Sequence, residues 1–132
     1  NTPLIKKLGI KAGDRVYTKH APQHYPNLVG DWPESAMLLT RITRNINVIH
    51  LFTNSKKGLT EFLPKAKNAI VENGMIWISW PKKSAKIPTD VTEDVIREVC
   101  LPMDLVDIKV CAVDDTWSAL KLVIRKEKRG NA

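Results

Sequence analysis

Apolar residues gather in short blocks along this chain, and polar or turn-forming residues separate the blocks. Short blocks rich in Val, Ile, Trp and Tyr are typical of β-strands. The near-continuous apolar run at 46–52 indicates a strand that is buried on both faces. Near the C-terminus, Val106, Ile108 and Val110 alternate with polar residues, so we expect one less covered face there. The predicted strands span 15–21, 36–42, 46–52, 75–80, 106–110 and 119–124.

Two helices are predicted between these strands. Apolar residues recur at helical spacing from 55 to 72, and Pro64 inside this stretch predicts a kink or two short helices. We expect Asn73-Gly74 to close the helix, with the glycine in the left-handed conformation. The sequence Asp90-Val91-Thr92-Glu93 has a capping-box pattern, which predicts that Asp90 is the N-cap of the second helix.

The predicted order is strand, strand, strand, helix, strand, helix, strand, strand. A short helical turn at 3–8 precedes it, and prolines exclude a long helix from 22–33. The middle of this order is typical of a parallel sheet with right-handed crossovers, whereas the short link at 114–117 requires an antiparallel final pair. We therefore predict an α/β fold: a reduced Rossmann-like sheet, mostly parallel with an antiparallel C-terminal strand, and helices on both faces.

Length and composition fit one globular domain. The chain has 132 residues, of which 43% are apolar, and this is enough to form a real core. We predict a single domain over 1–132, with an N-terminal helical turn in 1–12 and a frayed basic tail in 126–132. No apolar run approaches the length of a membrane helix, and no membrane partner is expected. Cys100 and Cys111 are expected to be separate buried thiols, which fits a cytoplasmic location.

The charge of the chain favours anionic partners. Lys and Arg number 21 and Asp and Glu number 14, which gives a net charge of +7. Much of the positive charge lies near the two ends. The tail is most simply a solvated end, and a phosphate-binding arm is the alternative.

Four segments carry a resemblance to class I SAM-dependent methyltransferases. The stretch Leu8 to Val16 resembles the approach to the first strand of that family. Residues 46–52 look like the fourth strand, and 63–81 are similar to the helix and fifth strand that follow. Residues 106–125 look like the closing antiparallel pair. The resemblance implies a methyltransferase-like Rossmann fold and, in an intact member, a SAM site.

The whole chain more closely resembles a small bacterial family of uncharacterised proteins, a domain of unknown function. This resemblance depends on Pro3 to Ile10, on Ser79-Trp80-Pro81-Lys82-Lys83-Ser84, and on Val110 to Ser118. It implies no known activity.

Three departures from the methyltransferase pattern argue against SAM binding. The turn after the first strand reads Lys19-His20-Ala21-Pro22-Gln23-His24 and lacks the glycines that let a backbone approach the cofactor. The second strand ends in Thr40-Arg41-Ile42-Thr43, without the acidic residue that would hold the ribose. Thr53-Asn54-Ser55 replaces the acidic catalytic turn. No cofactor is therefore expected.

A ligand site is still expected where the parallel strands end. This rim is basic and rich in hydroxyl groups, and the first amides of the helix after Ser55 would favour an anion if they face it. A phosphate or carboxylate pocket is one interpretation, and a solvated lysine-rich edge is the other. The candidate residues on the rim are His20, His24, Thr53, Asn54, Ser55, Lys56, Lys57, Lys82, Lys83, Ser84 and Lys86.

The tryptophans and the remaining polar residues are weaker indications of a site than the rim residues. Trp77 is expected in the core, whereas Trp80 and Trp117 could each cap the core or offer a stacking surface beside the rim. His50 is expected to be a core residue with satisfied hydrogen bonds. Asp114 is expected to form a turn with the residue that follows it. No catalytic residue or metal site is predicted, because no nucleophile elbow, zinc spacing or P-loop is present.

These observations favour a non-enzymatic binding module that takes an anionic small molecule or a protein partner at the rim. A divergent SAM-dependent methyltransferase is the first alternative. A nucleic-acid-binding domain is the second, and the spread of lysines over both termini without an aromatic-rich strand motif argues against it.

Overall fold

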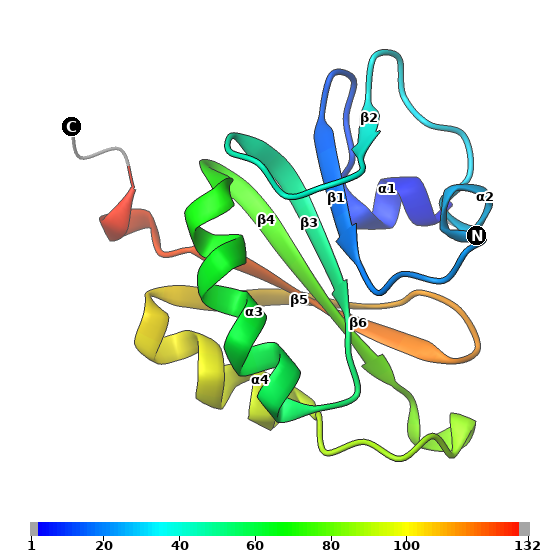
Figure 1. Ribbon diagram of the computed structural model, residues 1–132, viewed down its shortest axis with the longest axis vertical. Coiled ribbons are helices and arrows are strands. Elements are labelled where there is room, and N and C mark those ends of the chain that lie inside the picture. Colours follow the sequence, from blue (N-terminus) through cyan, green and yellow to red (C-terminus); the bar gives the residue numbers. More distant parts are fainter. Residues whose placement is uncertain (1–2, 130–132) are drawn as a thin grey trace.

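The computed structural model describes residues 3–129, and Figure 1 shows six strands in one twisted sheet. The strand order is β2-β1-β3-β4-β6-β5. Strands β1 to β4 run parallel, and β6 pairs antiparallel with both β4 and β5. The elements are α1 (Leu4–Leu8), β1 (Arg15–Lys19), α2 (Tyr25–Val29), β2 (Met37–Leu39), β3 (Ile46–Phe52), α3 (Lys56–Ala69), β4 (Ile70–Pro81), α4 (Glu93–Cys100), β5 (Leu105–Ala112) and β6 (Trp117–Ile124).

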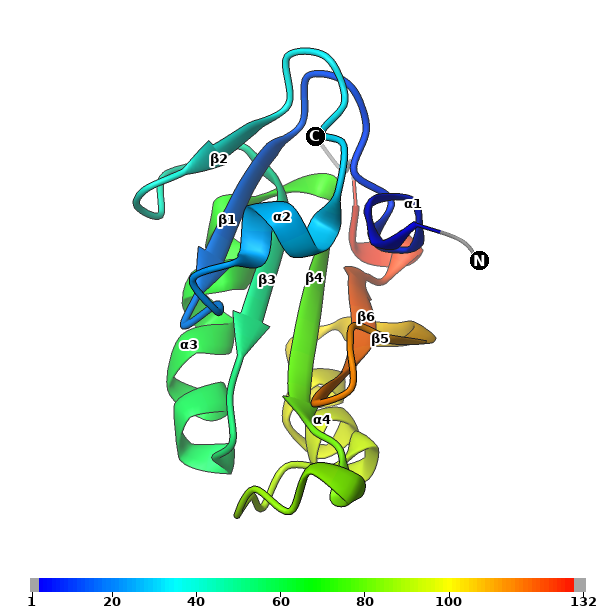
Figure 2. The ribbon, with the colours of Figure 1, turned by 90° about the vertical axis from the view of Figure 1, so that its right-hand side faces the viewer.

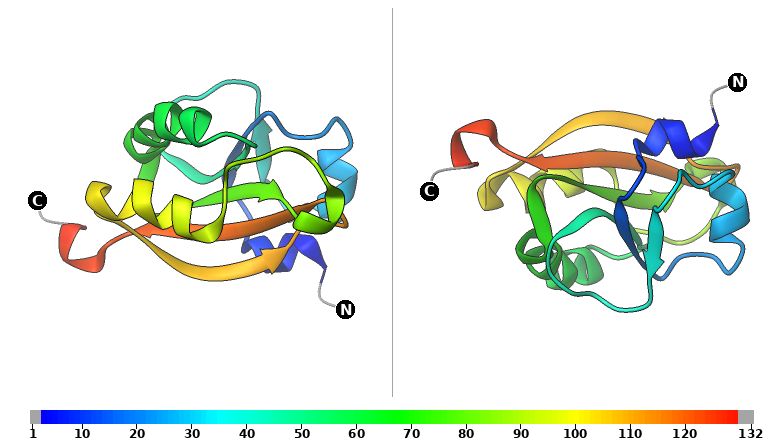
Figure 3. Two further views of the ribbon diagram at one scale, coloured as in Figure 1. Left: turned by 90° about the horizontal axis from the view of Figure 1, so that it is seen from below. Right: turned by 90° about the horizontal axis from the view of Figure 1, so that it is seen from above.

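Helices cover both faces of the sheet, as the apolar pattern predicts. Helices α3 and α4 lie on one face, while α1 and α2 lie on the other (Figures 2 and 3). Each face has its own apolar core, because the inward-facing residues of β3 and β4 alternate between the two sides. The predicted fold class is confirmed: a mixed α/β Rossmann-like sheet with antiparallel C-terminal strands.

The link between α3 and β4 differs from the prediction. Helix α3 ends at Ala69, its C-cap Ile70 is already extended, and Asn73-Gly74 lies inside β4. A Cβ at Gly74 would lie 3.0 Å from two backbone oxygens, those of Asn47 and Val71. The glycine is therefore needed for space where the β3–β4 register shifts, and the left-handed cap predicted for it is wrong.

The caps of the two long helices also differ from the prediction. Thr92, not Asp90, is the N-cap of α4, and its hydroxyl accepts a hydrogen bond from the amide of Val95. Helix α3 is continuous through Pro64, so the alternative of two short helices is wrong. In the proline-rich stretch, the five-residue helix α2 forms with Pro26 near its start, where a missing amide costs little.

Other features match the sequence. Cys100 and Cys111 are separate free thiols as predicted, but only Cys100 is buried and Cys111 is half-buried. Trp77 is fully buried and its ring N–H donates to the carbonyl of Leu8. Residues 126–128 form a 3-10 turn, whereas 1–2 and 130–132, which belong to the predicted helical turn and frayed tail, lie outside the described residues. Among the described helices, none is long and apolar enough to cross a membrane.

Candidate functional site

The first candidate site is a pocket of about 570 Å³ beyond the C-terminal ends of β1 and β3, which we call the strand-end pocket. Ligands of open α/β sheets bind in this position because connections leave the strands in different directions there. Helix α3 forms one wall. The lining residues are Tyr17, Lys19, His20, Ile42, Leu51, Phe52, Thr53, Asn54, Ser55, Gly58, Glu61, Phe62, Lys65 and Trp117.

Four aromatic residues, Tyr17, Phe52, Phe62 and Trp117, line this pocket. Tyr17 and Phe62 stack with their ring centroids 6.5 Å apart. Trp117 meets Phe52 edge-on at 5.1 Å. Because these pairs come from β1, α3, β3 and β6, the apolar lining is held by the sheet and its covering helix.

Charged side chains surround the aromatic rings. Lys19 comes from the end of β1, while Glu61 and Lys65 lie one turn apart on α3. Within the described chain, none of these three side chains forms a hydrogen bond or an ion pair. The lysines outnumber the glutamate, so the pocket has a positive balance that favours an anionic ligand.

The N-terminus of α3 is already occupied by groups of the chain itself. The Ser55 hydroxyl accepts from the amide of Gly58 at 3.0 Å, and the Asp90 carboxylate accepts from the amide of Lys56 at 2.7 Å. The Lys56 ammonium is 2.7 Å from the carboxylate of Glu98. Two of the first helix amides, those of Lys56 and Gly58, are therefore not free to hold an anion as expected, and Asp90 already supplies a negative charge there.

A buried hydrogen-bonded chain lies next to the pocket wall. The Tyr25 hydroxyl is 2.9 Å from Nδ1 of His50, and Nε2 of His50 is 2.5 Å from the Ser79 hydroxyl. Burial lowers the pKa of His50 to about 3 and raises the pKa of Tyr25. The His50 ring also stacks on Phe52 at 4.3 Å. His50 is thus a neutral core residue with both nitrogens satisfied.

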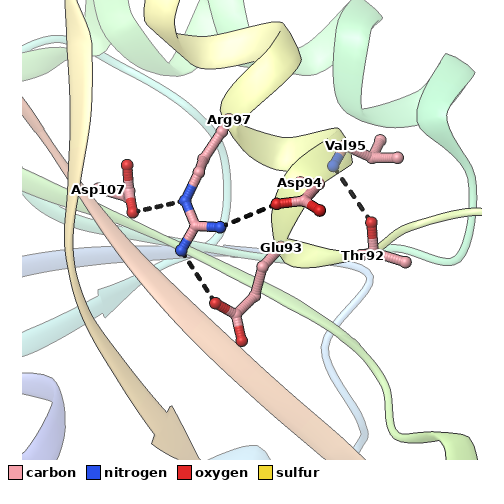
Figure 4. A network of polar contacts seen from close by, with 6 residues as sticks. All are labelled: Thr92, Glu93, Asp94, Val95, Arg97 and Asp107. Atoms are coloured by element: carbon pink, nitrogen blue, oxygen red, sulfur yellow. Dashed lines mark hydrogen bonds and ion pairs between the residues drawn. The ribbon is translucent and has the colours of Figure 1, made fainter.

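A second pocket of about 720 Å³ lies beyond the end of β4, and we call it the β4-end pocket. Trp80, Lys82 and Lys83 line it, together with Arg97 and two carboxylates of α4. Figure 4 shows that Arg97 contacts Glu93, Asp94 and Asp107, at 3.0, 3.1 and 2.9 Å. Since carboxylates already surround Arg97, only the two lysines of this pocket remain to attract an anion.

The predicted rim residues are thus divided. The strand-end pocket brings together His20, Thr53, Asn54, Ser55 and Trp117, and the β4-end pocket brings together Trp80, Lys82 and Lys83. The other predicted residues line neither pocket: His24, Lys56, Lys57, Ser84 and Lys86.

Sequence reasoning missed the α3 wall and the β1 side chains. Gly58, Glu61, Phe62 and Lys65 are spaced three, four and seven apart, so helical periodicity could have placed them on one face. Nothing in the sequence indicates that Tyr17 of β1 lies against this face. Within residues 3–129, no group of three or more His, Cys, Asp or Glu side chains could hold a metal ion.

The fold is shared with solved methyltransferase structures. No protein-family model and no curated protein matches the chain. A SAM-dependent methyltransferase from Aquifex aeolicus is similar over 91% of this chain and 87% of that one, with a TM-score of 0.62 and 12% identity. The fibrillarin pre-rRNA processing protein of Methanococcus jannaschii is similar over 95% and 70% of the two chains, with a TM-score of 0.62 and 11% identity.

A Streptococcus agalactiae protein of the NADB-Rossmann superfamily is also similar, over 95% of this chain and 69% of that one, with a TM-score of 0.58 and 10% identity. Identities this low show a common fold alone. The chain therefore has the same fold as these solved structures, two of which are a SAM-dependent methyltransferase and a fibrillarin.

The residues at the expected cofactor position do not fit SAM. The turn after β1 holds His20 at a φ of 60°, a left-handed conformation that favours glycine, and its side chain lines the pocket. Pro22 offers no amide to a ligand. Beyond β2 the chain continues through Thr40 and Arg41, without a carboxylate for ribose hydroxyls.

Proposed function

We propose that this chain is a non-enzymatic binding domain whose ligand occupies the strand-end pocket and combines a planar ring with an anionic group. The observation that carries the proposal is the pairing of an aromatic lining with two unpaired lysines, Lys19 and Lys65. A pocket of about 570 Å³ is of the size that holds small molecules, roughly 300 to 1,000 Å³.

We infer that the ligand carries an anionic group because two unpaired lysines, Lys19 and Lys65, line the pocket. Lys19 and Lys65 line the pocket from two different elements, β1 and α3, and a ligand carboxylate or phosphate group would be bound by both. A planar ring would stack on Tyr17 or Trp117. Such a ligand would pack against the apolar residues of the pocket and form ion pairs with its lysines at the same time.

The two groups whose pKa values burial shifts most strongly give no support for catalysis in the pocket. Enzymes shift the pKa values of the groups that react. Burial shifts the pKa values of Tyr25 and His50 strongly, but both are bonded to each other in the core and neither lines the pocket. These shifts are therefore explained by packing.

The test is titration of the purified protein with adenosine monophosphate and with benzoate, followed by calorimetry and thermal unfolding. At about 100 times its Kd, a bound probe adds roughly 2.7 kcal/mol to the free energy of unfolding, which raises Tm by several degrees. Lys65→Ala should weaken binding by at least about fivefold, because it removes one partner of the anion. Lys57→Ala is the matched control, because Lys57 is an exposed lysine of the same helix outside the pocket. The proposal fails if neither probe binds, or if the two variants weaken binding equally.

SAM-dependent methyl transfer is the second candidate, and the shared fold favours it. The same titration with SAM separates the two candidates. If SAM binds with micromolar affinity and Lys65→Ala does not change that affinity, the pocket is better explained as the cofactor site of a methyltransferase than as the proposed anion site.

A further inference from the structure

Four lysines gather on the sheet face opposite α3 and α4. Lys7 lies in α1 and Lys11 follows it, while Lys109 and Lys121 face each other across β5 and β6. Figure 3 shows α1 beside these strands, on the side away from α3 and α4. We call these four residues the lysine face.

The influence of these lysines on neighbouring titratable groups agrees with their placement on one face. Burial lowers the pKa of Lys121, and the positive charges of Lys109 and Lys11 lower it further. Burial raises the pKa of the Cys111 thiol, while Lys7 and Lys109 act in the opposite direction. Charges that influence the same groups in this way belong to one patch.

The ammonium groups of the lysine face are unpaired in the described part of the chain, although the Asp14 carboxylate lies near Lys11 and accepts from its backbone amide at 2.9 Å. Within residues 3–129, none of the four ammonium groups forms an ion pair or a side-chain hydrogen bond. Like charges directly opposite in an antiparallel pair are destabilising, so Lys109 beside Lys121 costs stability. The other face differs, because there three carboxylates surround Arg97 and Glu98 pairs with Lys56.

We propose that the lysine face binds the phosphodiester backbone of double-stranded nucleic acid without reading its sequence. The four charges come from α1, the loop after it, β5 and β6, and none lines either pocket, so they suit an extended polyanion. Lysine meets phosphate as a point charge, without the planar fork that arginine offers to base edges. Trp77, the cross-strand neighbour of Lys121, is fully buried, so it offers no stacking surface for unpaired bases.

The test is fluorescence anisotropy of a labelled duplex of random sequence, titrated at several salt concentrations. Each neutralised phosphate contributes about −0.9 to the slope of log affinity against log salt, so four contacts predict a slope of about −3.6. Lys109→Ala with Lys121→Ala should make the slope less negative by about 1.8. Lys57→Ala with Lys86→Ala is the matched control, since it removes the same charge from exposed positions elsewhere. Both double variants should still unfold in one cooperative transition, which shows that they are folded, and Lys109→Ala with Lys121→Ala should not be less stable than wild type because it removes a like-charge pair.

Three results would overturn the proposal. The first is no binding of the duplex at about 50 mM salt, where phosphate contacts are strong. The second is an equal change of slope in both double variants, which would indicate a net-charge effect. The third is binding of polyglutamate as tight as that of the duplex, which would indicate a general anionic partner. None of these results bears on the strand-end pocket, because the lysine face lies outside it.

Discussion

The carboxylate of Asp90 accepts a hydrogen bond from the backbone amide of Lys56, 34 positions earlier in the chain, at 2.7 Å. Asp90 therefore joins the loop before α4 to the start of α3. Its negative charge also interacts favourably with the positive N-terminal end of the helix dipole. This bond is reinforced nearby, because the Thr89 hydroxyl donates to the carbonyl of Asn54 at 2.9 Å.

Asp90→Ala should lower the free energy of unfolding by about 1 kcal/mol, because it removes a cap and leaves the Lys56 amide without its partner. Asp90→Asn keeps an acceptor and loses only the charge, so a smaller loss is expected. Urea unfolding of both variants measures the difference. Equal stability of Asp90→Ala and wild type would show that water replaces the carboxylate without cost.

Ser79→Ala should destabilise the fold by about 1–3 kcal/mol, because it leaves one nitrogen of the fully buried His50 ring without a partner. Ser118→Ala on the neighbouring strand is the control, since no hydrogen bond of its hydroxyl is lost. Thermal unfolding compares the two. If both variants unfold at the same temperature, the His50–Ser79 bond contributes nothing to stability.

Acid should weaken the fold through His50. Burial lowers its pKa from 6.5 to about 3, so in the unfolded state the ring binds a proton in this range and in the folded state it does not. The free energy of unfolding should therefore fall as the pH drops from 6.5 towards 3, by up to about 1.4 kcal/mol per pH unit from this residue. The part of the window above about pH 5 is the most informative, because ordinary carboxylates remain ionised there.

His50→Gln removes the titrating ring and should flatten the pH dependence between about pH 5 and pH 6.5. The variant is expected to be less stable at neutral pH, so its slope with pH, not its absolute stability, is the quantity to compare. An unchanged slope would mean that another group titrates in this window.

The number and order of the strands could be predicted from the sequence, while some of their bounds and most of the site could not: β2 is Met37–Leu39, not 36–42, and β4 begins at Ile70, not at 75. The near-continuous apolar run at 46–52 predicted the observed bounds of β3, Ile46–Phe52, because a strand buried on both faces is apolar at most of its positions, and the buried His50 is satisfied by hydrogen bonds. Asp90 was placed on the wrong helix because the capping pattern of Asp90 to Glu93 is local, whereas its partner Lys56 is distant in sequence. The strand-end pocket could be predicted only in part. The ends of the strands are indicated by local sequence, whereas packing between distant segments decides which side chains of α3 lie against Tyr17.

Gly74→Ala should destabilise the fold by about 1–3 kcal/mol, the usual cost of overpacking. The added Cβ would lie 3.0 Å from the carbonyl oxygens of Asn47 and Val71, and backbone atoms cannot move aside as a flexible side chain can. Asn73→Ala, one residue earlier and exposed, should change stability by less than about 0.5 kcal/mol. Urea unfolding of the pair tests this, and a harmless Gly74→Ala would mean that the β3–β4 register shift can relax.

Lys109→Glu should stabilise the protein while it weakens binding of a nucleic-acid duplex. The change replaces a like-charge pair with an opposite-charge pair across β5 and β6, which is worth about 0.2–1 kcal/mol. The gain should shrink at about 1 M salt, where the Debye length is near 3 Å. Urea unfolding at low and high salt measures the stability, and anisotropy measures the duplex. A stabilised variant that no longer binds would indicate that the lysines at this position are kept for binding at a cost to the fold. A variant that is no more stable than wild type would show that Lys109 and Lys121 do not repel each other in the folded protein.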